Sequence, residues 1–143
     1  MKLVIVEDEV ILAMALSLML EEWGHQVVGT ADNEAGAVAL VQAMRPDAVV
    51  MDIRLGRKES GLRAARRIRE NQDLPIVFCT AYADSPPIQA EIRAITNAHL
   101  VAKPVDEDQF EWLLRRIGER RQAAARPISA AASLPIEITA TDA

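Results

Sequence analysis

Five polar side chains follow short apolar runs of the chain, each at the point where a run ends. They are Glu7 and Asp8 after residues 3–6, Asp52 after residues 48–51, Thr80 after residues 76–79 and Lys103 after residues 100–102. If these ends meet, the three carboxylates would repel one another by about 1–4 kcal/mol per pair. A divalent cation relieves such repulsion, and Mg²⁺ prefers a few carboxylates together with water. The lysine and the threonine suit an anionic ligand beside the metal, such as a phosphoryl group.

The elements that must position these side chains alternate along the chain. Runs rich in β-branched residues predict five strands, and the stretches between them have helical spacing. The predicted strands are Leu3–Val6, Gln26–Thr30, Ala48–Met51, Ile76–Cys79 and Leu100–Ala102. Strands that alternate with helices predict an α/β fold, with an open, doubly wound parallel sheet and helices on both of its faces. Ligands of such sheets bind at the carboxyl ends of the strands, where the five side chains lie.

Composition and charge narrow the classes of protein. Half of the 143 residues are hydrophobic and 26% are charged, as in an ordinary globular domain. The net charge of −5 argues against a domain that coats nucleic acid. Arginines near the C-terminus lack interleaved aromatic residues and therefore indicate the solvated face of a helix. These arginines are Arg115, Arg116, Arg120, Arg121 and Arg126.

The location of the protein is also constrained. The single cysteine, Cys79, excludes an internal disulfide and indicates a reducing compartment. Acids interrupt the apolar run at the N-terminus after a few residues, so this segment does not resemble a signal peptide. The longest nearly apolar stretch, residues 10–20, is too short to cross a bilayer. We expect a cytoplasmic protein that binds neither nucleic acid nor a membrane.

The C-terminal residues differ in character from the rest. Residues 123–143 are rich in Ala, Pro, Ser and Thr and have no sustained period, which predicts a flexible tail. A short strand at residues 134–138 is the alternative for part of this segment. We therefore expect one domain at residues 1–122, followed by a tail at residues 123–143.

Four motifs at the predicted strand ends occur together in a known family. They read VEDE (6–9), MDIRL (51–55), FCTAY (78–82) and AKP (102–104). Each is common alone, but all four in this order make a specific signal. The chain resembles the receiver domain of two-component response regulators over residues 1 to about 121. The resemblance implies a flavodoxin-like receiver fold with strand order 2-1-3-4-5, and a switch that works by aspartyl phosphate.

The resemblance also implies roles for individual residues in phosphoryl transfer. Asp52 is expected to accept phosphate from a histidine kinase or a histidine phosphotransfer protein. Lys103 is expected to pair with the phosphoryl oxygens, and Thr80 to form a hydrogen bond with them after phosphorylation. A cis peptide bond is expected between Lys103 and Pro104.

A Mg²⁺ site is implied in the same way. Asp8 and Asp52 are expected to bind the metal directly, and Glu7 partly through water. The backbone carbonyl of Arg54 is expected to be a further ligand. Arg54 and Tyr82 occupy the positions that flank the acyl phosphate in the family, and they are therefore expected to tune its lifetime.

Two positions depart from the family pattern. Leu100 stands where receivers usually carry Tyr or Phe, the aromatic residue that rotates inward as the threonine moves. Tyr82 is a candidate to take part of that role. Gly56 stands where a proline is usual, so the loop after Asp52 is expected to be more basic and more flexible.

The helix predicted after the first strand is unusually apolar, because Ser17 is its only polar residue between positions 10 and 20. One helical face holds Ile11, Met14, Ala15 and Leu18. If the fold buries a single face, other apolar residues are candidates for an exposed patch. The candidates are Leu12, Leu16, Met19 and Leu20. Such a patch predicts a surface for the histidine donor or for a homodimer; deeper burial is an equally weighted alternative.

The function expected from these features is that of a stand-alone receiver. It is not an enzyme but a phosphoacceptor whose output is protein–protein interaction or the draining of phosphate from a shared kinase. One alternative is the receiver part of a truncated DNA-binding transcriptional regulator. A second is an aspartate-nucleophile phosphatase of the haloacid dehalogenase type, which would need an acid where Arg54 stands. A third is a binding module that works without phosphorylation.

Overall fold

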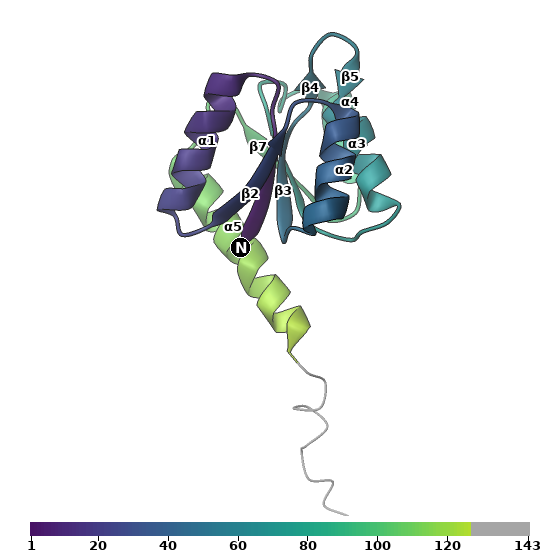
Figure 1. Ribbon diagram of the computed structural model, residues 1–143. Coiled ribbons are helices and arrows are strands. Elements are labelled where there is room, and N and C mark those ends of the chain that lie inside the picture. The colour runs from purple at the N-terminus through teal and green to yellow at the C-terminus, as the bar shows by residue number, and fades with distance from the viewer. Residues whose placement is uncertain (127–143) are drawn as a thin grey trace, which may run out of the picture.

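A five-stranded parallel sheet forms the centre of the computed structural model, which describes residues 1–126 (Figure 1). Its strands are β1 (Lys2–Val6), β2 (Gln26–Ala31), β3 (Ala48–Asp52), β6 (Ile76–Thr80) and β7 (Ala98–Ala102). Their order in the sheet, β2-β1-β3-β6-β7, confirms the predicted doubly wound topology. The carboxyl ends of β1, β3, β6 and β7 therefore lie along one edge of the sheet.

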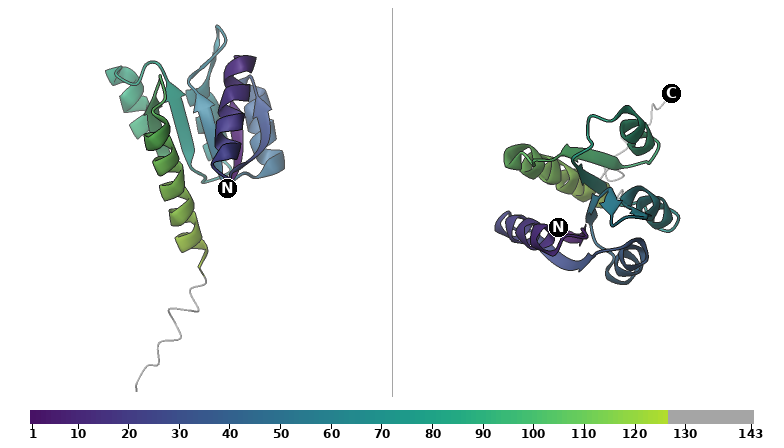
Figure 2. Two further views of the ribbon diagram at one scale, coloured as in Figure 1. Left: turned by 90° about the vertical axis from the view of Figure 1, so that its left-hand side faces the viewer. Right: turned by 90° about the horizontal axis from the view of Figure 1, so that it is seen from above.

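Helices cover both faces of the sheet. The five helices are α1 (Val10–Glu22), α2 (Glu34–Met44), α3 (Gly61–Arg69), α4 (Pro86–Arg93) and α5 (Glu107–Ala125). Helices α1 and α5 lie on one face, and α2, α3 and α4 lie on the other (Figures 1 and 2). Within residues 1–126, no helix is both long enough and apolar enough to span a bilayer.

Local sequence explains where several helices begin. Asn33 and Asp106 accept hydrogen bonds from backbone amides of the first turns of α2 and α5. Ser60 does the same for α3. Pro86 and Pro87 occupy the first turn of α4, where a missing amide proton costs no helical hydrogen bond.

The core consists of two apolar clusters, one on each side of the sheet. On one side Met51 and Phe78 pack with residues of α2, α3 and α4. On the other side Val50 and Leu3 pack with Phe110 and other residues of α1 and α5. Strands β1, β3 and β6 are covered on both faces, which explains why their sequences are continuous apolar runs rather than alternating ones.

Helix α1 is rotated relative to the sequence-based expectation. Leu20 is fully buried, and Leu16 and Met19 pack against the core, so three of the four predicted patch residues are not exposed. The exposed face is instead formed by Val10, Ile11, Leu12, Met14 and Leu18. A helix that is apolar on all sides has no contrast to indicate its buried face, and the prediction of Leu16, Met19 and Leu20 as a patch was therefore wrong.

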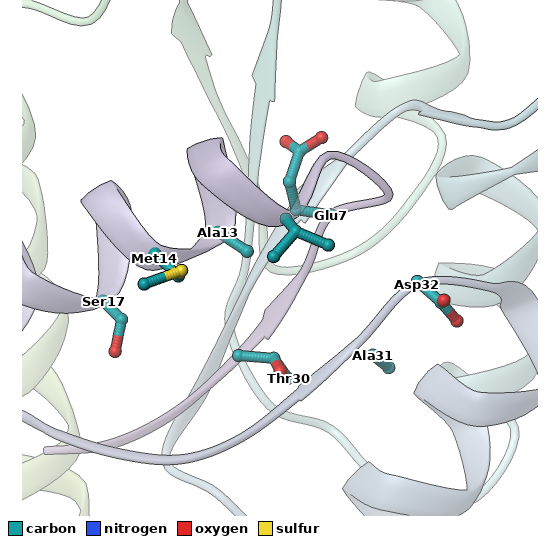
Figure 3. Close-up of a pocket in the computed structure, with 8 residues that line it drawn as sticks. Glu7, Ala13, Met14, Ser17, Thr30, Ala31 and Asp32 are labelled. Atoms are coloured by element: carbon teal, nitrogen blue, oxygen red, sulfur yellow. The ribbon is translucent and has the colours of Figure 1, made fainter.

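A groove of about 400 Å³ runs between α1 and the edge strand β2. Met14 and Ser17 line it from the helix, and Thr30 lines it from the strand (Figure 3). Figure 3 shows the carboxylate of Glu7 pointing away from these three side chains. The exposed apolar face of α1 therefore continues into a hollow beside the sheet edge.

Two further differences concern segments beyond the central sheet. The loop after Asp52 contains a small antiparallel hairpin, β4 (Arg54–Leu55) and β5 (Glu59–Ser60), with Gly56 at φ 72° in its turn. Strands of two residues carry no periodic signal, so the sequence did not indicate them. Helix α5 continues to Ala125, three residues into the predicted tail, because alanine has the highest helix propensity. The possible strand at residues 134–138 lies outside the described residues.

Candidate functional site

Three carboxylates meet at the carboxyl edge of the sheet. Glu7 and Asp8 follow β1, and Asp52 is the last residue of the neighbouring strand β3. One carboxylate oxygen from each of the three lies within 4.8 Å of the others. Glu7 is buried, Asp52 is half-buried and Asp8 is exposed. The set therefore opens to solvent on the side of Asp8 and offers the oxygen ligands that Mg²⁺ prefers.

Lys103 supplies the positive charge of the site. Its Nζ lies 3.2 Å from Oδ2 of Asp52 and 3.3 Å from Oε2 of Glu7. Lys103 follows β7, two strands away from β3, so its long side chain reaches back across β6. The lysine bridges two acids that would otherwise repel each other.

The charges and the burial of the site shift the pKa values of Glu7 and Lys103. Burial raises the pKa of Glu7 to about 6, and the charge of Asp52 adds to this effect. The backbone amide of Glu9 and the ammonium group of Lys103 oppose it. Burial alone would lower the pKa of Lys103, but the carboxylates of Asp52 and Glu7 outweigh burial and raise it.

The segment after Asp52 is fixed by backbone contacts. The Arg54 amide donates to Oδ1 of Asp52 at 3.3 Å, and the Gly56 amide donates to Oδ2 of Asp8 at 2.9 Å. A Cβ on Gly61 would lie 2.0 Å from the carbonyl oxygen of Asp52, so only glycine fits there. Gly56 and Gly61 thus support the site although neither was predicted as part of it. Only the three-dimensional approach of their backbones shows their role.

Thr80 and Tyr82 lie beside the acids at the end of β6. Thr80 is 1% exposed, and its Oγ1 accepts a hydrogen bond of 3.0 Å from the Tyr82 amide. The Arg54 guanidinium lies over the Tyr82 ring, with its carbon 4.6 Å from the ring centre. The two residues that were predicted to flank the acyl phosphate are thus in contact with each other. The predicted cis bond between Lys103 and Pro104 is also present.

Comparison with known proteins agrees with this geometry. The family model "Response regulator receiver domain" matches residues 3–115. The chain belongs to the response regulator receiver family. The five-stranded parallel sheet, in the predicted order, is the receiver fold that its structural neighbours share.

Curated relatives of this receiver are longer proteins. The transcriptional regulatory protein PdtaR of Mycobacterium tuberculosis is 35% identical over 100 residues, which cover 70% of this chain and 48% of PdtaR. The phyllosphere-induced regulator PhyR of Methylorubrum extorquens is 33% identical over 131 residues, which cover 87% of this chain and 46% of PhyR. The chain thus spans about half the length of these relatives.

Solved structures show the same fold for this receiver. The N-terminal domain of a response regulator/sensory box/GGDEF protein from Carboxydothermus hydrogenoformans has a TM-score of 0.75 and 30% identity. The alignment covers 87% of this chain and 98% of that domain. The response regulator PhyR from Brucella abortus has a TM-score of 0.69 and 33% identity, with 87% of this chain and 51% of PhyR covered.

Leu100, the departure from the usual receiver pattern, lies on the edge strand β7. It is half-buried and packs against the apolar cluster of α2, α3 and α4. It also lines a groove of about 510 Å³ together with Ala83 and Trp112. The position at which the resemblance implies a switching aromatic residue is filled here by a side chain without a polar atom.

Proposed function

We propose that Asp52 is the phosphoacceptor of a two-component phosphorelay. The supporting observation is the position of its carboxylate, 3.2 Å from Lys103 Nζ and beside Glu7 and Asp8. A histidine kinase or histidine phosphotransfer protein would supply the phosphoryl group. The bond from phosphorus to the donor's imidazole nitrogen breaks as the bond to a carboxylate oxygen of Asp52 forms. The donor imidazole takes up a proton as it leaves.

The residues around Asp52 have complementary tasks in this proposal. Lys103 pairs with the phosphoryl oxygens after transfer. Thr80 Oγ1 already accepts a hydrogen bond from the Tyr82 amide, so its hydroxyl proton is available to donate to a phosphoryl oxygen. Arg54 and Tyr82, stacked on each other, limit the access of water to the acyl phosphate.

The acidic set fits a Mg²⁺ ion by the chemistry of its donors. Asp8 and Asp52 are the proposed direct ligands, together with the backbone carbonyl of Arg54. Glu7 is the proposed partly water-mediated ligand. When bound, Mg²⁺ would neutralise the negative charge that gathers on the acids and the phosphoryl oxygens. No other protein ligand within residues 1–126 is needed, since Mg²⁺ keeps several waters.

The exposed apolar face of α1 is the proposed docking surface for the histidine donor. It begins at Val10, three residues after Glu7, so a protein bound there lies next to the acids. A homodimer through the same face is the alternative use.

The proposed output is the binding of a downstream protein or the draining of phosphate from a shared kinase, in the cytoplasm. The proposed receiver domain comprises residues 1–122.

The phosphoacceptor can be tested by intact mass. The protein is incubated with a small-molecule phosphodonor and Mg²⁺, and the gain of one phosphoryl group is measured. Asp52→Asn should lose the gain completely. Asp73→Asn, an exposed aspartate away from the site, is the matched control and should retain it. An Asp52→Asn protein that still gains a phosphoryl group would show that the acceptor lies elsewhere.

A second arrangement is supported by the length of the relatives. PdtaR and AfsQ1 of Streptomyces coelicolor are named transcriptional regulatory proteins, and this chain covers 48% and 60% of them. The receiver would then be the input part of a DNA-binding regulator. Sequencing the reading frame beyond Ala143 tests this arrangement, because a following helix-turn-helix segment would favour it over a stand-alone receiver.

A further inference from the structure

A third groove lies beside the β4–β5 hairpin, outside the set of acids. Its volume is about 670 Å³, and it runs between the hairpin, α3 and α4. Figure 1 shows this hairpin projecting above the carboxyl edge of the sheet. Arg54, Arg57, Lys58 and Arg63 line the groove, and Ile88 lines it from α4. The groove is thus mainly basic, and Ile88 adds an apolar side chain from α4.

The charge of this region opposes that of the whole protein. Residues 54–69 contain seven Arg or Lys residues and one acid, Glu59, giving the segment a net charge of +6. The whole chain carries −5, so the remaining residues carry −11. Four of the seven cations line the groove, against the two acids Glu59 and Glu91. This local excess of positive charge on an acidic protein indicates a surface that meets a negatively charged partner.

The basic side chains of the hairpin differ in their pairing. Arg63 is held by Glu34, with Nε 2.8 Å from Oε1. Arg57 and Lys58 are exposed and form no ion pair within residues 1–126. Two cations at the rim are therefore available to a ligand without breaking an existing contact.

The backbone that carries these two cations is held at both ends. The Gly56 amide donates to Asp8, and Arg63 donates to the carbonyl oxygen of Lys58. The two strands of the hairpin also pair, Arg54 with Ser60 and Leu55 with Glu59. These hydrogen bonds restrain a loop that the sequence led us to expect to be flexible, so a ligand would have less of the backbone to order, which favours affinity.

We propose that this groove binds an acidic segment of a partner protein, with carboxylates at Arg57 and Lys58 and an apolar side chain against Ile88. A nucleic acid is the less favoured ligand. Glu59 and Glu91 lie on the same groove and would face a continuous phosphate backbone, and the −11 charge of the remaining chain repels a long polyanion. A short peptide can place its acids at the two cations and avoid both glutamates. Arg54 belongs both to this groove and to the proposed phosphoryl-transfer site, but the proposal rests on Arg57, Lys58 and Ile88 and does not depend on Asp52 being phosphorylated.

The experiment measures fluorescence anisotropy of a rhodamine-labelled peptide of Glu-Glu-Leu repeats with the full chain. A Lys-Lys-Leu peptide and an oligothymidylate are the comparison probes. The test variant is Arg57→Glu/Lys58→Glu, and Arg57→Gln/Lys58→Gln removes the same charges without adding acids. The matched control is Arg115→Glu/Arg120→Glu on α5, which changes the net charge equally on another element. Circular dichroism establishes that each variant is folded.

The acidic peptide should bind the unmodified chain, and the charge-reversal variant should bind it about tenfold more weakly or worse. The Gln variant should show a smaller loss, and the α5 control should bind as the unmodified chain does. Absence of peptide binding, or an equal loss in the α5 control, would overturn the proposal. Oligothymidylate that binds more tightly than the peptide through Arg57 and Lys58 would replace it with a nucleic-acid site.

Discussion

The carboxylate of Asp8 has two roles: it accepts a hydrogen bond from the Gly56 amide, and it belongs to the acidic set with Glu7 and Asp52. We predict that Asp8→Asn stabilises the metal-free protein by up to about 1 kcal/mol, since it removes repulsion while an amide oxygen still accepts the hydrogen bond. The same change should abolish the rise in melting temperature that Mg²⁺ produces in the unmodified protein. Thermal melts with and without Mg²⁺ measure both effects, and Asp73→Asn should keep the Mg²⁺ effect. An unchanged Mg²⁺ response in Asp8→Asn would exclude Asp8 as a ligand.

Glu7 makes stability depend on pH in a defined window. Its pKa in the folded protein is about 6, against an ordinary value of 4.5. Between these values the folded state holds more protons than the unfolded state, so the free energy of unfolding falls as pH rises from 4.5 to 6. The loss should reach about 1–2 kcal/mol near neutral pH.

Glu7→Gln should remove this decrease. Urea unfolding in the presence of a chelator, at pH values on both sides of the window, measures it. Glu21→Gln, which changes an exposed acid on α1, should leave the decrease in place. If Glu7→Gln keeps the full pH dependence, another group is responsible.

Leu100 should weaken the switch between the two states of the receiver. In the active state a leucine fills part of the space that an inward-turned aromatic side chain would fill. In the inactive state it has no hydroxyl group that could hold the side chain in an outward position. We expect a small free-energy gap; at about 1.4 kcal/mol, roughly one molecule in ten is active before phosphorylation. Trp112 shares a groove with Leu100, so its fluorescence should report the change when a beryllofluoride phosphate mimic is added. Leu100→Tyr should enlarge the fluorescence change, and Thr80→Ala should largely remove it. A fluorescence spectrum of the free protein that shows no active population would contradict the small free-energy gap between the two states.

At the scale of the element, the position of α3 against β3 depends on the absence of a side chain at Gly61. A Cβ at Gly61 would meet the Asp52 carbonyl oxygen at 2.0 Å, so Gly61→Ala should lower the free energy of unfolding by about 1–3 kcal/mol or more. Gly118 in α5 provides the comparison, because its nearest atom would be Met1 Sδ at 3.6 Å. Gly118→Ala should raise stability by about 0.5–1 kcal/mol through helix propensity. Chemical unfolding of both variants tests the pair, and equal effects would show that α3 can move away from Asp52.

The rotation of α1 leads to a second comparison between elements. Leu20 is fully buried, and Leu20→Ala should cost about 2–5 kcal/mol. Ile11 is 81% exposed, and Ile11→Ala should change stability by less than about 0.5 kcal/mol. Thermal and urea unfolding measure both values. A large loss for Ile11→Ala would mean that α1 buries the face first expected from the sequence.

At the scale of the whole molecule, the topology was predictable and some of its details were not. Each strand that ends on a site residue has its own apolar run, and parallel sheets place such ends together, so the convergence of Asp52 with Lys103 followed from local patterns. The buried face of α1 did not, because an apolar helix of this kind looks alike from every side. The Gly56–Asp8 hydrogen bond and the Arg54–Tyr82 contact join segments far apart in sequence, and no local pattern encodes them.

Arg57 and Lys58 place two exposed cations at the tip of the hairpin, and neither forms an ion pair within residues 1–126. An acidic surface attracts these cations before any contact forms, which favours encounters that begin at the hairpin. The rate of that encounter should fall steeply as salt shortens the range of the field, while encounters with neutral surfaces keep their rate.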